Sequence, residues 1–171
     1  STISVQSDTE VVKAAISDLI AQLNKVQSLI SSQIASSTDA DGKITLGVLA
    51  AEALPTEIAR ELRSKITGSV TGITSTIKRL ESIGYASSGY TNEITLDDSE
   101  KLDSALRDNL GQVKSLFTTE TYGVGISIYD YLDNVLDDDG AMASTQKNMT
   151  DQVSDITKQI ADHERMVQSK R

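Results

Sequence analysis

The sequence predicts a mainly α protein: long antiparallel heptad helices in a coiled-coil-like bundle, with shorter helices and one small β-hairpin. Two stretches near opposite ends of the chain, residues 7–34 and 141–171, carry aliphatic side chains at alternating steps of three and four, which is the spacing of a heptad seam. Aromatic side chains make up only 4% of the residues, and Pro occurs once. This composition suits long helices packed side by side better than a typical enzyme core.

The first long helix is predicted over residues 7–34, which contain neither Pro nor Gly. Ser7 and Glu10 have the spacing of a capping box at its start. Ile20, Leu29 and Ile34 widen the apolar stripe beyond what one partner helix would cover. The seam residues, which are our candidates for assembly contacts, are Val12, Ile16, Leu19, Leu23, Val26 and Ile30.

The second long helix is predicted over residues 141–171. An apolar stripe of this length cannot stay in water and remain helical, because ordering the backbone costs as much as burial returns. We therefore expect the two long helices to pack antiparallel, with packing against segments outside this chain or against neighbouring subunits as the alternative. The seam residues and assembly candidates of the second helix are Met149, Val153, Ile156, Ile160, His163 and Val167.

The elements between the long helices are shorter. Pro55 predicts a break and a helix restart, while residues 69–79 fit a helix or a strand equally well. The segment after Ile34, rich in Asp, Ser and Gly, is predicted to be a turn. Asp97, Asp98 and Ser99 are good helix N-caps. The predicted elements are helices over 46–67, a hairpin over 80–96, and short helices over 99–117 and 124–137. Within 99–117, a second short helix is predicted to start at residue 109.

The domain organisation follows from these elements. Residues 1–6 alternate polar and apolar side chains and are predicted to be the end of a strand that leaves a domain absent from this chain. Residues 7–171 are predicted to form one helical shaft domain.

The charge of the chain excludes several function classes. With 16 basic and 25 acidic side chains, the formal net charge is −9, so a basic footprint for nucleic acid or anionic membranes is missing. No apolar run is long enough for membrane insertion. The absence of Cys removes disulfides, thiolate metal sites and a Cys nucleophile.

No residue is expected to be catalytic, and no cofactor or metal is expected. The acidic clusters at Asp41 and at 137–139 place Val48 and Gln146 where a calcium loop needs a bidentate Glu. His163 is the only histidine and lies on a seam, where a structural role is favoured. An enzyme, the alternative from another class, would require a deep pocket with several convergent polar groups.

A succession of short motifs occurs in the second half of the chain. A Leu-x-x-Ile-Gly segment precedes a turn and an Ile-Thr-Leu-Asp segment, and a Lys-Leu-x-x-Ala-Leu helix and a Val-x-x-Leu-Phe segment follow. With Asn24 in the first helix, this order resembles the C-terminal region of the bacterial flagellar filament cap family (hook-associated protein 2, FliD), without the head domain or terminal tail. The matching residues are Leu80, Ile83, Gly84, Tyr85, Ile94, Thr95, Leu96, Asp97, Lys101, Leu102, Ala105, Leu106, Val113, Leu116 and Phe117, with Glu164 and Arg165 in the last helix.

The resemblance implies a structural and chaperone-like function. Members of this family form a homo-oligomeric, ring-like cap at the tip of the extracellular filament and promote insertion of flagellin. The implied partners are flagellin and the hook–filament junction proteins, and export proceeds through the flagellar secretion apparatus without a cleaved signal peptide. The alternatives are another axial flagellar protein, such as a junction subunit or flagellin-like segment, and an adhesin or carbohydrate-binding module.

Overall fold

The fold was analysed in a computed structural model, which describes residues 6–87, 89 and 92–169. The chain divides into two compact units, Ser1–Asp130 and Tyr131–Arg171, and each is described by itself. The predicted strand over residues 1–6 and the side chain of Ser7 in the predicted capping box lie outside the described residues, although Gln6 is helical.

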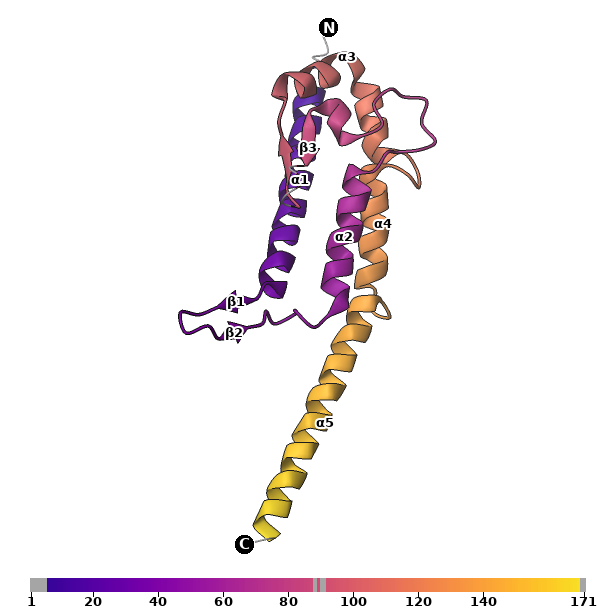
Figure 1. Cartoon of the computed structure of the whole chain (residues 1–171). Coiled ribbons are helices and arrows are strands. Elements are labelled where there is room, and N and C mark those ends of the chain that lie inside the picture. Colours follow the sequence, from indigo (N-terminus) through magenta and orange to yellow (C-terminus); the bar gives the residue numbers. More distant parts are fainter. Residues whose placement is uncertain (1–5, 88, 90–91, 170–171) are drawn as a thin grey trace. The chain divides into compact units, whose positions relative to one another are not determined.

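The predicted mainly α fold class, including a small antiparallel hairpin, is confirmed (Figure 1). The elements in chain order are α1 (Gln6–Ile34), β1 (Ser37–Thr38), β2 (Ile44–Thr45), α2 (Ala53–Thr67), the 3₁₀ helix η1 (Leu80–Ile83), β3 (Tyr85–Ser87), β4 (Ile94–Leu96), α3 (Ser99–Thr118), α4 (Val124–Leu136) and α5 (Ala141–Ser169).

Helices α1 and α2 lie side by side in the first unit (Figure 1). The segment before α2 returns to the end of α1, where the Leu49 N–H donates to the Gln33 carbonyl oxygen at 3.0 Å. Helix α2 therefore starts at the C-terminal end of α1 and runs antiparallel to it. The buried aliphatic residues of these two helices are Ile16, Ile20 and Leu23 on α1 and Ile58, Leu62 and Ile66 on α2.

The predicted helix over residues 46–52 is wrong, because these residues form turns and α2 begins at Ala53. Pro55 is the third residue of α2. A first-turn N–H has no acceptor within its own helix, so Pro costs nothing there and need not mark a restart. The predicted break and restart at Pro55 is therefore also wrong, because Pro55 lies in the first turn of an unbroken helix.

The predicted turn after α1 is present, and the two short strands β1 and β2 flank it. The Asp39 carboxylate accepts hydrogen bonds from the N–H groups of Asp41, at 3.0 Å, and Lys43, at 2.8 Å. Gly42 completes the turn with a φ of +80°, which a residue with a Cβ rarely adopts. Sequence analysis missed this second hairpin because β1 consists of Ser and Thr without an apolar alternation.

Residues 69–79 form neither a helix nor a strand. Val70 and Ile77 are buried, and the Val70 N–H donates to the Lys78 carbonyl oxygen at 2.8 Å. The segment is therefore an irregular loop that is anchored at both ends by aliphatic side chains.

The hairpin is shorter than predicted, since residues 80–83 form η1 and the strands pair in the register Tyr85↔Leu96. Gly84 links η1 to β3 with a φ of +91°. Its carbonyl oxygen accepts from the N–H groups of Asp97 and Asp98 at 3.0 and 3.1 Å. One peptide group thus ties both ends of the hairpin together.

Helix α3 starts where the N-cap signals predicted. The Asp98 carboxylate accepts from the Lys101 N–H at 2.9 Å, which satisfies one of the free amides of the first turn. Asn109 has non-helical backbone angles (φ −137°, ψ 32°) and divides α3 at the position where two short helices were predicted to meet. The two halves bury separate sets of side chains, Leu102, Ala105 and Leu106 before the break and Val113 and Leu116 after it.

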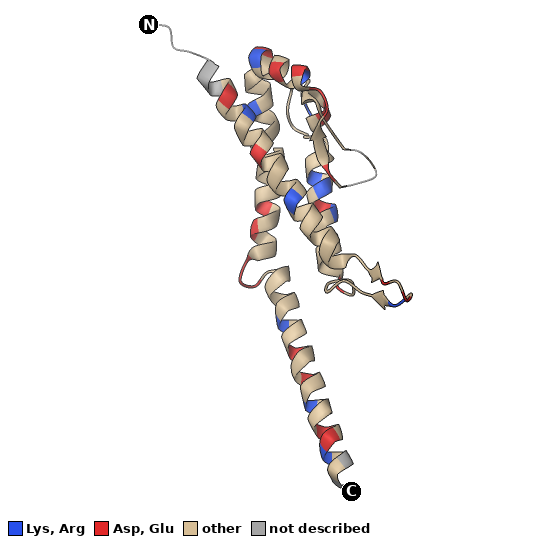
Figure 2. Ribbon diagram, turned by 90° about the vertical axis from the view of Figure 1, so that its left-hand side faces the viewer, with Lys and Arg blue, Asp and Glu red and all other residues tan. Residues whose placement is uncertain are grey.

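The second unit consists of the end of α4 and the whole of α5. Both positive and negative side chains occur along α5 (Figure 2), including the pairs Lys158–Asp155 and Arg165–Asp162 at a spacing of three residues. Within the described residues, no helix combines the length and apolar character that crossing a membrane requires. The predicted antiparallel pairing of the two long helices would join the two units and stays a prediction.

Candidate functional site

Six of the twelve assembly candidates lie on α1, and polar side chains fix this helix in the first unit. Asn24 Nδ2 donates to the Ile94 carbonyl oxygen at 2.8 Å, and the Ile94 N–H donates to Asn24 Oδ1 at 2.9 Å. A side-chain amide carries the same donor and acceptor pair as a peptide group. Asn24 therefore pairs with β4 as a neighbouring strand would, and α1 is attached to the hairpin along its length.

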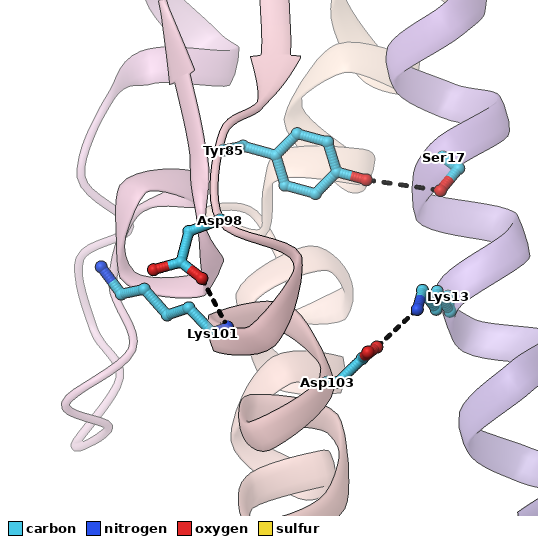
Figure 3. Close-up of polar contacts among 6 residues, drawn as sticks. All are labelled: Lys13, Ser17, Tyr85, Asp98, Lys101 and Asp103. Atoms are coloured by element: carbon cyan, nitrogen blue, oxygen red, sulfur yellow. Dashed lines mark hydrogen bonds and ion pairs between the residues drawn. The ribbon is translucent and has the colours of Figure 1, made fainter.

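Two further contacts hold the N-terminal half of α1 (Figure 3). Lys13 Nζ donates to the Asp103 carboxylate on α3, and this hydrogen bond raises the pKa of Lys13 above its usual value. Ser17 Oγ lies 3.4 Å from the hydroxyl of Tyr85 on β3. Tyr85 is itself buried, so its ring fills the space between the hairpin and α1.

One face of α1 carries an apolar groove within the first unit. Its volume is about 440 Å³, and Lys114 and Thr118 are its only polar lining residues. The apolar lining comes from three helices: Val12, Ala15, Ile16 and Leu19 of α1, Phe117 of α3, and Gly125 and Ile126 of α4. We refer to this set of lining residues as the apolar groove.

Further apolar side chains on α1 are exposed outside the groove. Leu29 is 60% exposed, Val26 is 39% exposed, and Val11 is 63% exposed. The apolar stripe of α1, whose width predicted more than one partner, is therefore partly exposed in the first unit.

The predicted seam of α1 divides into two sets. Ile16 and Leu23 are buried against the unit's own core, whereas Val12, Leu19 and Ile30 are half-buried and Val26 is exposed. The buried face is displaced from the predicted seam and runs through Ile16, Ile20, Leu23 and Gln27. The structure thus brings Val12, Ile16 and Leu19 together in the groove and separates them from Val26.

The predicted seam of α5 is largely exposed. Val153, Ile156 and Ile160 are 64%, 56% and 55% exposed, Met149 is half-buried, and His163 is exposed. The side chain of Val167 lies outside the described residues. An apolar stripe without cover on one helix face is the pattern of a coiled-coil partner surface.

The residue that sequence analysis missed is Gln27, the one polar side chain in the buried core of the described residues. Its Nε2 donates to the Ala59 carbonyl oxygen on α2 at 2.8 Å, while Oε1 is buried without a partner. A signal was available, since Gln27 continues the spacing of Ile20 and Leu23 towards Ile30 and Ile34. It was overlooked because the heptad was assigned from aliphatic residues alone.

The described residues hold no group of three or more His, Cys, Asp or Glu side chains that could bind a metal. The polar lining of the groove consists of one cationic side chain, Lys114, and one hydroxyl side chain, Thr118. Its lining suits contact with apolar side chains and offers no general acid and base pair.

Comparison with known proteins identifies a family that covers the whole chain. The family model described as "Flagellar hook-associated protein 2 C-terminus" matches residues 1–171. A comparison with curated protein sequences found no match.

Among solved structures, the chain is similar to a crystal structure of the flagellar cap protein FliD D1-D2-D3 domains from Escherichia coli. The TM-score is 0.66 at 23% sequence identity, and the match covers 79% of this chain and 35% of that chain. At this identity the likeness shows a shared fold. The chain spans about a third of the length of the protein it matches.

Proposed function

Because the chain belongs to the flagellar hook-associated protein 2 C-terminal family, we propose that it is a structural, chaperone-like part of a flagellar filament cap. In this proposal the full-length protein self-associates as a ring at the extracellular tip of the filament and promotes insertion of flagellin. It reaches that position through the flagellar secretion apparatus without a cleaved signal peptide, and it also contacts the hook–filament junction proteins. No covalent chemistry is assigned to the chain.

The observation that carries the proposal is the apolar groove. Helix α1 is fixed by Asn24 and Lys13 on the side of the hairpin and α3, so its groove face is held in one orientation. Half-exposed Leu19 and Phe117 present aliphatic and aromatic surface there without a catalytic arrangement. A rigid apolar face of this kind supports assembly with a second copy of the protein.

The proposal is tested in cells that lack their own cap protein. The full-length protein with Leu19→Asp is expected to lose swimming in soft agar and to release flagellin into the medium, since the charge places a desolvation penalty on any contact in the groove. Val11→Asp is the matched control, because Val11 is exposed on the same helix but does not line the groove. It should retain swimming.

Two measurements separate assembly from folding. Sedimentation velocity of the purified full-length protein should show that Leu19→Asp reduces the oligomer while far-ultraviolet circular dichroism keeps its helix content. Deletion of residues 1–171 that leaves filament growth and flagellin retention intact would refute the cap function. Unchanged oligomerisation in Leu19→Asp would remove the groove from the self-association surface.

A further inference from the structure

Gln27 occupies a position on a helix face whose other members are aliphatic. The buried or half-buried face of α1 runs through Ile16, Ile20, Leu23, Gln27, Ile30 and Ile34, at alternating steps of four and three. Gln27 is only 6% exposed. A polar side chain at one position of an apolar seam lowers stability but distinguishes one helix register from another.

The aliphatic side chains facing Gln27 do not define a register by themselves. The buried residues Ile58, Leu62 and Ile66 of α2 repeat every four residues. Sliding α2 along α1 by one turn, about 5 Å, would replace each of them by a side chain of similar size and shape. The contacts made by these aliphatic residues are therefore nearly the same in both positions.

The hydrogen bond from Gln27 Nε2 to the Ala59 carbonyl oxygen does distinguish the two positions. Ala59 is buried, and its methyl side chain is small enough for the side-chain amide of Gln27 to approach the α2 backbone. One turn away on either side, the residues are Pro55 and Arg63, which both carry larger side chains. A slide would leave the buried Gln27 Nε2 donor without its partner, as Oε1 already is, and this has a high free-energy cost.

The connection between the helices carries one backbone hydrogen bond to α1, from the Leu49 N–H to the Gln33 carbonyl oxygen at 3.0 Å, which a slide would have to break. Residues 35–52 join α1 to α2, and the hairpin of β1 and β2 within them is exposed. Arg63 also attaches α2 to the rest of the unit, through hydrogen bonds to Ser87 at 2.6 Å and Asn92 at 2.9 Å. These bonds come from a long, partly exposed side chain that can follow a displacement of one turn.

We propose that Gln27 and Ala59 form a register lock: one buried hydrogen bond that selects a single position of α2 along α1 from positions that the aliphatic contacts alone do not separate. Burying Gln27 Oε1 without a hydrogen-bond partner lowers the stability of the unit, and this is the cost of selecting one position. A one-turn slide between packed helices is a known form of conformational switching. In this proposal the side chain of Gln27 decides whether α2 can slide along α1.

The test measures the position of α2 directly. The chain has no Cys, so Asp18→Cys and Glu57→Cys, both exposed on α1 and α2, accept nitroxide labels at two sites only. Pulsed electron paramagnetic resonance on the otherwise native chain should give one distance. Gln27→Leu should add a second population displaced by up to about 5 Å, with helix content unchanged and a melting temperature equal to or above that of the parent.

Two more variants make the outcome unambiguous. Ala59→Leu should give the same second population, because it blocks the approach of the amide from the other side. Gln22→Leu is the matched control, since it makes the same chemical change at an exposed position of α1, and it should keep the single distance. A single, unshifted distance in both Gln27→Leu and Ala59→Leu overturns the proposal, as does loss of helix content or a lower melting temperature in Gln27→Leu.

Discussion

The side chain of Asn24 and the backbone of Ile94 are hydrogen-bonded in both directions, at 2.8 and 2.9 Å, although 70 residues separate them in the chain. This pair joins the long first helix to the hairpin without any apolar contribution. It also gives a structural role to Asn24, the residue of α1 that contributes to the resemblance to the family.

Replacing Asn24 should destabilise the first unit. Asn24→Ala leaves the N–H and carbonyl of part-buried Ile94 without partners, and we expect a loss of about 2 kcal/mol in the free energy of unfolding. Chemical denaturation monitored by circular dichroism measures this loss. Asn24→Asp is the informative control: it keeps the acceptor for the Ile94 N–H but cannot donate to the carbonyl oxygen, so it should recover only part of the stability.

Leu23 and Leu19 should respond differently to the same substitution. Leu23 is 7% exposed in the core, so Leu23→Asp buries an unpaired carboxylate and should unfold the unit, with a loss above about 4 kcal/mol. Leu19→Asp should keep the helix content, because Leu19 is half-exposed in the groove. Thermal melts of the two proteins measure the difference. Equal melting temperatures would show that the groove and the core are not distinct surfaces.

The Lys13–Asp103 pair should make stability depend on alkaline pH. The hydrogen bond to Asp103 raises the pKa of Lys13 in the folded protein, so its stabilising effect is complete below the unfolded value of about 10.4 and is lost as pH rises through the folded pKa. The melting temperature should therefore fall more between pH 9.5 and 11.5 in the native chain than in Lys13→Met. The effect is small, since both side chains are partly exposed. Parallel pH profiles would contradict it.

Gly84→Ala should be among the most damaging changes to a glycine. The residue has a φ of +91°, and a Cβ there would lie 2.2 Å from the Asp98 carbonyl oxygen. Strain and displacement of α3 should together cost about 3 kcal/mol, measured by chemical denaturation. Gly89→Ala is the matched control, since it shares a positive φ but has open space around its Cβ position. It should cost about 1 kcal/mol.

The sequence predicted the elements whose signals are local. The N-cap at Asp98, the hairpin within residues 80–96 and the break at Asn109 all depend on neighbouring residues. The start of α2 was misplaced because Pro55 is compatible with two helix positions, and the hydrogen bond between Leu49 and Gln33 helps to distinguish them. That bond is a tertiary contact, which periodicity does not encode.

The candidate site was predicted in part. The α1 stripe was recognised as too wide for one partner, and Val12, Ile16 and Leu19 do line the apolar groove. Phe117 and Ile126 complete it from helices far along the chain, so no local pattern could have included them. Gln27 was missed because a heptad assigned from aliphatic residues passes over a buried amide, whose role depends on the carbonyl it meets on α2.

The double hydrogen bond at the Gly84 carbonyl has a consequence for variation among related chains. Because Asp97 and Asp98 close the hairpin at its base, residues 85–96 begin and end at the same point of the fold. Extra residues inserted between β3 and β4 would lengthen a connection whose two ends are already fixed, and the free-energy cost of closing a connection changes only slowly with its length. The hairpin is thus the place where this fold can accept a peptide tag or a natural insertion without moving α1 or α3.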